Sequence, residues 1–286
     1  MYYSLVIISV ILFGGGFALN DVYRRLRSSG FASSMESAFV GALAGLVVLL
    51  IINGFALQAT PFTLCIALLS ALCGLAFTFC SLKALDSVNL SLHSLFSMLG
   101  GMLLPFFLGI FLYGEKVTLS KIVCVVFVCA ALSLAVSRDK ANKGTLYCLG
   151  IFVFNGMGGV LSKIFTAAPL EKASAESFSI WIAIFTALIS GAILLVFFRK
   201  SNAPRYTWKA AAVGATNGAI NRLANFLLVI ALAHIDASVQ YPMITGGVII
   251  VSTAVCCLQK NTPTKKELLS VALAFVGMLA LFLIKI

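Results

Sequence analysis

Ten apolar runs, separated by short polar segments, fill the chain from end to end. An α-helix needs about 20 mostly apolar residues to cross a bilayer, and each run is close to that length. The predicted spans are 2–20, 34–53, 61–82, 89–112, 119–136, 145–165, 175–198, 208–232, 237–258 and 266–284. The connectors are too short to form a soluble domain. The pattern therefore predicts an all-α polytopic membrane protein with ten transmembrane helices.

The composition agrees, with 61% hydrophobic residues, 10% charged residues and a mean hydropathy of +1.10. The first span has no basic segment before it and no Ala-x-Ala cleavage site after it, so we expect a retained helix rather than a signal peptide. The eight cysteines lie in or beside apolar runs without a Cys-x-x-Cys pair. They are expected to fill packing space, and no disulfide, metal site or cofactor is predicted.

The net charge of +11 comes from residues in the connectors. It therefore indicates how the chain is oriented in the membrane rather than nucleic-acid binding. Fourteen basic residues lie on one side, in the odd-numbered connectors: Arg24, Arg25, Arg27, Lys83, Arg138, Lys140, Lys143, Arg199, Lys200, Arg205, Lys209, Lys260, Lys265 and Lys266. Five lie on the other: Lys116, Lys121, Lys163, Lys172 and Lys285. Short cytoplasmic loops carry the Lys and Arg excess, so both termini are predicted to be outside.

Local patterns in the second half repeat those of the first, which predicts two five-helix units, 1–143 and 144–286. The matching segments are 15–20 with 158–163, 35–37 with 175–177, 84–91 with 231–238, and 100–101 with 246–247. An odd number of helices per unit inverts the second unit in the membrane. Inverted repeats are typical of secondary transporters, in which two halves alternate around a central site. A duplication retained for folding alone is the other explanation.

These features make the chain similar to the drug/metabolite transporter (DMT) superfamily, in particular its ten-helix EamA-like members. Besides the tandem plan, the resemblance rests on Ala84-Leu85, Pro105, Gly114-Glu115-Lys116, Phe154-Asn155-Gly156, Lys163, Ala231-Leu232 and Pro242. It implies a carrier or exporter of small metabolites, amino acids or drugs in a bacterial inner membrane, with a cavity lined by helices 1, 3, 4, 6, 8 and 9. The chain departs from the family at Gln259-Lys260 and Asn20. Similar carriers also have both termini inside, against the charge bias.

Arg222 is the one basic residue in the interior of a predicted span, roughly two-thirds of the way along 208–232. A charge at such a depth costs about 3 kcal/mol on insertion scales and persists where it is paired or faces a cavity. One hypothesis is that its guanidinium binds a carboxylate or phosphate group of a substrate. The other is a structural clamp on carbonyl groups or on a carboxylate of the protein.

Asn217, Asn221 and Asn225 recur every fourth residue and form a polar stripe that Arg222 flanks. Their counterparts in the first unit are Ser70, Gly74 and Thr78. Small or polar residues in both units suit helices that line a cavity, although hydrogen bonds between helices would explain them as well.

Other polar residues gather at the starts of spans four and nine, where Ser91, His93, Ser94 and Ser97 correspond to Ser238, Gln240 and Tyr241. A single histidine is more often a structural donor than a proton carrier. Trp181 and Tyr241 could bind a cation or anchor the membrane interface. The candidate substrate-binding residues are therefore Arg222, Asn217, Asn221, Asn225, His93, Gln240, Tyr241, Trp181, Ser70 and Thr78.

The carboxylates are expected at helix ends, with Glu36 and Glu176 as helix-start charges and Asp21 in a solvated ion pair. No predicted span has a carboxylate at its centre, which favours an anionic or zwitterionic solute over a cation. No enzyme motif is found, so catalysis is not predicted. The expected function is a carrier of a small metabolite, acting as a monomer or homodimer in the lipid bilayer without a nucleic-acid partner. Export of cationic drugs or amines, an intramembrane enzyme and a channel are the alternatives.

Overall fold

The computed structural model describes residues 2–27, 30–113, 118–135, 143–200, 207–232, 237–259 and 264–283. These residues form ten α-helices: α1 (Tyr2–Arg27), α2 (Phe31–Ile52), α3 (Pro61–Ala84), α4 (Leu90–Tyr113), α5 (Leu119–Ala135), α6 (Lys143–Ala167), α7 (Ala175–Lys200), α8 (Trp208–Leu232), α9 (Ala237–Leu258) and α10 (Lys265–Leu283). Each predicted span coincides with one helix. α8 and α9 have the predicted bounds, whereas α1 continues seven residues beyond its apolar run.

Within the described ranges, five helical stretches are long and apolar enough to cross a membrane: Tyr2–Arg27, Phe31–Ile52, Pro61–Ala84, Gly144–Ala167 and Ala175–Val196. Large apolar side chains are exposed on their outer faces, for example Ile11 at 55% and Leu195 at 69%. Such faces are stable against lipid and not against water. The fold is that of an α-helical membrane protein.

Several helix starts are fixed by local hydrogen bonds. The side chain of Thr60 accepts from the amide of Thr63, with Pro61 as the first residue of α3. Asn89 caps α4 by accepting from the amide of Leu92 at 2.9 Å. At α10, Thr264 and Glu267 satisfy each other's backbone amides. These caps replace hydrogen bonds that the first turn of a helix cannot make internally.

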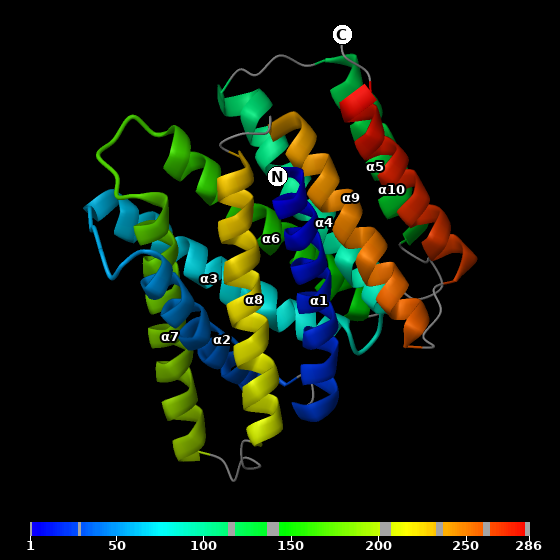
Figure 1. The fold of residues 1–286 in the computed structure, drawn as a ribbon. Coiled ribbons are helices and arrows are strands. Elements are labelled where there is room, and N and C mark those ends of the chain that lie inside the picture. Colours follow the sequence, from blue (N-terminus) through cyan, green and yellow to red (C-terminus); the bar gives the residue numbers. More distant parts are fainter. Residues whose placement is uncertain are drawn as a thin grey trace.

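The helices form one bundle, with α5 and α10 side by side at one flank and α2 and α7 at the other (Figure 1). α1 packs on α8 and α9, while α6 packs on α3 and α4. α2 contacts α8, and α7 contacts α3. α1 begins and α10 ends at the same end of the bundle, the top in Figure 1. We call the opposite end, where α1, α3 and α9 end, the basic end.

Glycines set the closest helix approaches. A Cβ atom on Gly218 of α8 would lie 2.1 Å from the carbonyl oxygen of Gly41 on α2, so only glycine fits at this crossing. The Gly-x-x-x-Gly spacings 41–45 and 214–218 therefore form the packing surfaces between α2 and α8. One turn further along α2, a Cβ on Gly45 would lie 2.6 Å from Cγ of Arg222.

A second kind of close approach occurs twice in the bundle. Between α4 and α6, Gly100 lies against Phe152 and Gly156 lies against Leu104. Between α9 and α1 there is a corresponding set, in which Gly247 lies against Val10 and Gly14 lies against Val251. The α4 and α9 members are 147 residues apart, and the α1 and α6 members are 142 apart. The two interfaces therefore share the same spacing of glycine contacts.

Candidate functional site

Arg222 lies within the bundle on the face of α8 that meets α2. Its aliphatic stem runs over Gly45, where the missing side chain leaves room for it. The side chain is partly exposed. No residue in the described ranges forms a hydrogen bond or ion pair with its guanidinium. All its donors are thus available to an external acceptor.

The asparagine stripe of α8 lies over a different neighbour, α1. Asn217 Nδ2 donates to Asn20 Oδ1 at 2.8 Å, and Asn221 Nδ2 donates to Asn217 Oδ1 at 2.7 Å. A Cβ on Gly16 of α1 would lie 2.7 Å from Asn221 Nδ2, so the two helices are in close contact here. The structure brings Asn217 and Asn221 together with α1 rather than with the Arg222 head group. These two amides hold helices together.

Asn225 differs from the other two asparagines because its side chain is exposed. At 3.6 residues per turn it points between Asn221, which faces α1, and Arg222, which faces α2. Leu223, which is 38% exposed, marks the outer face of α8, and Asn225 is not on that face. Asn225 is therefore exposed on the inward side of the helix, one turn from Arg222.

The corresponding part of α3 is also open. Gly74 is exposed, and no heavy atom lies within 4 Å of the position that a Cβ would take. Thr78 is partly exposed, and its hydroxyl donates to the carbonyl of Gly74 at 2.9 Å. Ser70 is buried, and its hydroxyl has no hydrogen-bond partner among the described residues. Polar or open positions thus occur at matching places on α3 and α8.

The remaining predicted site residues lie apart from this region or outside the described side chains. Trp181 donates from Nε1 to the carbonyl of Gln58 at 2.9 Å and packs on Phe185, so it joins α7 to the connector before α3. Gln240 and Tyr241 belong to α9, but their side chains lie outside the described part of the structure.

The start of α4 forms a buried polar cluster near the basic end. His93 is completely buried, with Nε2 2.7 Å from Ser81 Oγ of α3 and the ring of Phe17 edge-on at 5.1 Å. The hydroxyls of Ser91 and Ser94 contact those of Thr253 and Ser252 on α9. His93 is thus enclosed by the protein in this structure, and its place in a substrate site stays a prediction.

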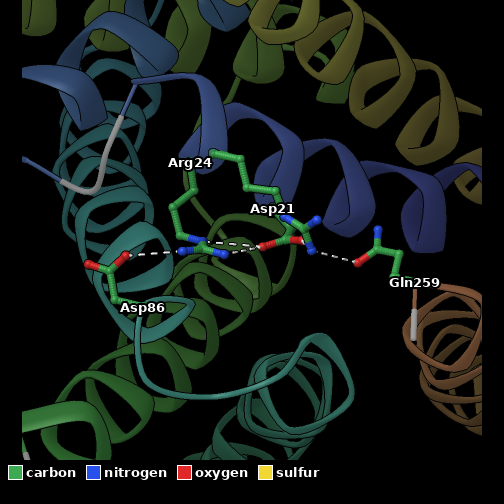
Figure 2. A network of polar contacts seen from close by, with 5 residues as sticks. Asp21, Arg24, Asp86 and Gln259 are labelled. Carbon is green, nitrogen blue, oxygen red and sulfur yellow. Dashed lines mark hydrogen bonds and ion pairs between the residues drawn. The ribbon is translucent and has the colours of Figure 1, made fainter. Parts of the chain in front are cut away.

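Ion pairs close over this cluster at the end of α1 (Figure 2). Asp21 is only 4% exposed and pairs with Arg24 at 2.9 Å and with Arg25 at 2.7 Å. Arg24 also reaches Asp86 after α3, and Arg25 donates to Gln259 after α9. The expected ion pairing of Asp21 is confirmed. Its carboxylate is buried rather than solvated, whereas the side chain of its partner Arg25 is 52% exposed.

Glu36 also differs from its expected role as a helix-start charge. Arg27 donates to both carboxylate oxygens of Glu36, from Nε at 2.8 Å and from Nη2 at 2.6 Å. The two side chains are 8% and 4% exposed. The sequence places them nine residues apart across a connector, so spacing alone does not reveal that they pair.

Asn155 is a polar residue of α6 that sequence reasoning recognised only as part of a family motif. Its Nδ2 donates to the backbone carbonyl of Ser97 at 2.6 Å. A Cβ on Gly101 would come within 2.8 Å of the same nitrogen. The Ser97 hydroxyl itself is buried without a hydrogen-bond partner in the described ranges. No pattern within α6 indicates that this asparagine faces α4.

Comparison with known proteins bears on the fold alone. No family model matches the chain, and no curated protein matches it. One solved crystal structure is similar over 96% of this chain and 94% of its own, with a TM-score of 0.60 and 16% sequence identity. The arrangement of helices therefore exists in a solved protein of nearly the same extent.

Proposed function

We propose that this chain is a secondary transporter that carries a small anionic or zwitterionic solute, such as an amino acid, by alternating access. Its EamA-like sequence pattern motivates this proposal. The two halves, 1–143 and 144–286, would form inverted five-helix repeats of ten transmembrane helices. The solute would bind between them, in the membrane of a bacterial cell.

The helix packing supports the repeat. In the proposed repeat, each helix of one half corresponds to the helix five places away in the other half, so that α1 corresponds to α6 and α3 corresponds to α8. When each helix is exchanged for its counterpart, the α1–α8 contact becomes α6–α3, α1–α9 becomes α6–α4, and α2–α8 becomes α7–α3. All six contacts are present. The two sets of glycine contacts follow the same exchange, at the level of single residues. Two equivalent halves are the physical basis for two equivalent states that open to opposite sides.

The observation that carries the proposed substrate class is Arg222. A partly exposed guanidinium inside an apolar helix bundle is costly unless something compensates its charge. Because no described residue pairs with it, a bound anion is the compensation that we propose. A carboxylate would accept two parallel hydrogen bonds from the planar group. Asn225, one turn away and exposed inward, would contact the rest of the solute.

The basic end supports a gated carrier rather than an open channel. The four ion pairs found among the described residues lie there. Two are within α1, one joins α1 to α2, and one joins α1 to the segment after α3. Hydroxyl contacts between α4 and α9 lie beneath them. In the proposed alternating-access cycle, these bonds would break when the basic end opens and re-form when it closes.

The test is counterflow in liposomes that contain the purified protein. A thermal-shift screen against amino acids, organic anions, nucleosides and quaternary amines identifies the solute, because a ligand of the folded state raises its melting temperature. Liposomes loaded with unlabelled solute should then accumulate the labelled form transiently. Flux that does not saturate and shows no counterflow would indicate a channel. Chemical conversion of the solute would indicate an enzyme, and either result contradicts the proposal.

A further inference from the structure

The side-chain amide of Asn225 has a fixed orientation. Its Nδ2 donates to the backbone carbonyl of Asn221 at 2.8 Å. Because a carbonyl oxygen only accepts hydrogen bonds, the nitrogen of the amide must lie on this side and Oδ1 on the other. The residue is exposed on the inward side of α8. Oδ1 therefore presents to the interior of the bundle an acceptor that no described residue fills.

Arg222 lies beside this acceptor and has the opposite hydrogen-bonding character. It precedes Asn225 by three residues, and side chains at this spacing are neighbours on a helix. Its guanidinium has N–H donors and no acceptor. A Cβ on Gly45 of α2 would lie 2.6 Å from Arg222 Cγ and 3.4 Å from Nε, so the absence of that atom lets the arginine stem lie against α2. α8 thus presents a cationic group of donors next to a neutral acceptor.

The charge of Arg222 limits the charge of the solute. The other charged residue of α8 is Lys209, at the exposed start of the helix. The charged residue of α2 is Glu36, which is bonded to Arg27 nine residues before Gly45. A charge inside an apolar bundle is costly unless it is compensated. A solute with one negative charge makes a neutral complex with Arg222, whereas a zwitterion leaves the positive charge uncompensated and a dianion leaves a negative one.

The Asn225 oxygen adds a second requirement. When a solute displaces water from Oδ1, that acceptor loses a hydrogen bond unless the solute supplies a donor. An ammonium group is such a donor, but it brings back the excess positive charge. A hydroxyl group is a donor without charge. One negative charge together with a hydroxyl group close to it satisfies both Arg222 and Asn225.

We propose that the solute is a short hydroxy acid with one carboxylate, an inference that rests on the proposed transport function. The guanidinium of Arg222 donates two hydrogen bonds to the carboxylate, and the hydroxyl of the solute donates to Asn225 Oδ1. Because the two side chains are neighbours on α8, the hydroxyl belongs on the carbon next to the carboxylate. Arg222 selects for the negative charge, and Asn225 is the residue that distinguishes hydroxy acids from other monocarboxylates.

The experiment compares three probes with one carbon skeleton. Propionate, lactate and alanine carry a hydrogen, a hydroxyl and an ammonium group at the carbon next to the carboxylate. Equilibrium binding of each labelled probe is measured on the purified protein in detergent. Lactate should bind roughly 2- to 10-fold more tightly than propionate, the usual contribution of one hydrogen bond. Alanine should bind more weakly than lactate, because its complex retains an uncompensated charge. This comparison needs no variant.

Two variants of Asn225 test its part in this preference. Asn225→Ala removes the acceptor and keeps a good helix former, so lactate should bind no better than propionate, whose affinity should not change. Asn225→Asp adds a negative charge beside Arg222 and should reverse the preference, so that alanine binds more tightly than lactate. Thr166→Ala is the control, because this exposed hydroxyl of α6 also bonds to the carbonyl four residues earlier on its own helix. It should bind all three probes like the parent.

Equal binding of lactate and propionate by the parent would overturn the inference, as would tighter binding of alanine or no binding of any of the three. An Asn225→Ala protein that keeps the parent's preference for lactate would also overturn it. Each of these results leaves the proposed transport function intact when another solute shows counterflow. A parent without counterflow for any solute of the thermal-shift panel would overturn both.

Discussion

Gly41 of α2 and Gly218 of α8 meet backbone to backbone, and this contact fixes how close the two helices are where Arg222 emerges. A Cβ on Gly218 would lie 2.1 Å from the Gly41 carbonyl oxygen and 2.4 Å from its Cα. Since both obstacles are backbone atoms, neither can rotate away. The helices would have to separate.

Gly218→Ala is therefore expected to destabilise the protein by about 1–3 kcal/mol, the usual cost of overpacking. The measurement is the melting temperature of the purified protein in detergent. Gly15→Ala is the matched control, because no heavy atom lies within 4 Å of its would-be Cβ. An alanine there should be neutral or slightly stabilising. Equal melting temperatures for both variants would contradict the close crossing.

The buried pair of Arg27 and Glu36 predicts an asymmetric response to mutation. Glu36→Gln leaves a buried arginine without its counter-charge and should cost about 3–5 kcal/mol. Replacing both partners by apolar residues, in Arg27→Met with Glu36→Leu, should recover most of that loss. Thermal or denaturant unfolding of the three proteins makes the comparison.

Asp86→Asn provides the control for that series. Its carboxylate also pairs with an arginine, but its side chain is 40% exposed. Exposed pairs contribute about 0–1 kcal/mol, so this variant should unfold close to the parent. If Glu36→Gln were equally mild, the Arg27–Glu36 pair would not be buried as described.

The charge bias predicts that the basic end faces the cytoplasm, with both termini outside. An alkaline phosphatase fusion after Ile286 should then be active, and a fluorescent reporter that needs the cytoplasm should stay dark. The opposite pattern would mean that both termini are inside. In that case Arg24, Arg25 and Arg27 would lie outside, against the distribution of basic residues.

The apolar pattern predicted helix positions well, because burial in lipid imposes a nearly continuous apolar run. It ended α1 too early, at Asn20, since Arg24, Arg25 and Arg27 are polar but still helical. Which helix each residue faces could not be predicted. Asn221 and Arg222 are adjacent in sequence, yet one packs on α1 and the other on α2. Such partners depend on how helices meet, which no periodicity within one helix contains.

The same limit explains the charged residues. Asp21 and Glu36 were expected at helix ends, but Asp21 lies six residues before the end of α1 and Glu36 lies five residues after the start of α2. Their burial depends on neighbours from other elements. His93 was recognised as polar and near a helix start. Its enclosure by Phe17 and Ser81 depends on contacts from α1 and α3 that the sequence of α4 does not determine.

The most direct test of the transport proposal is solute binding and counterflow in Arg222 variants. Arg222→Lys keeps the charge but loses the planar pair of donors, so both should fall while the protein remains folded. Arg222→Ala should abolish both, and Lys209→Ala, which removes an exposed charge at the start of the same helix, should leave them unchanged. If folded Arg222→Ala binds and exchanges the solute like the parent, Arg222 does not recognise the substrate and the proposed anionic site is wrong.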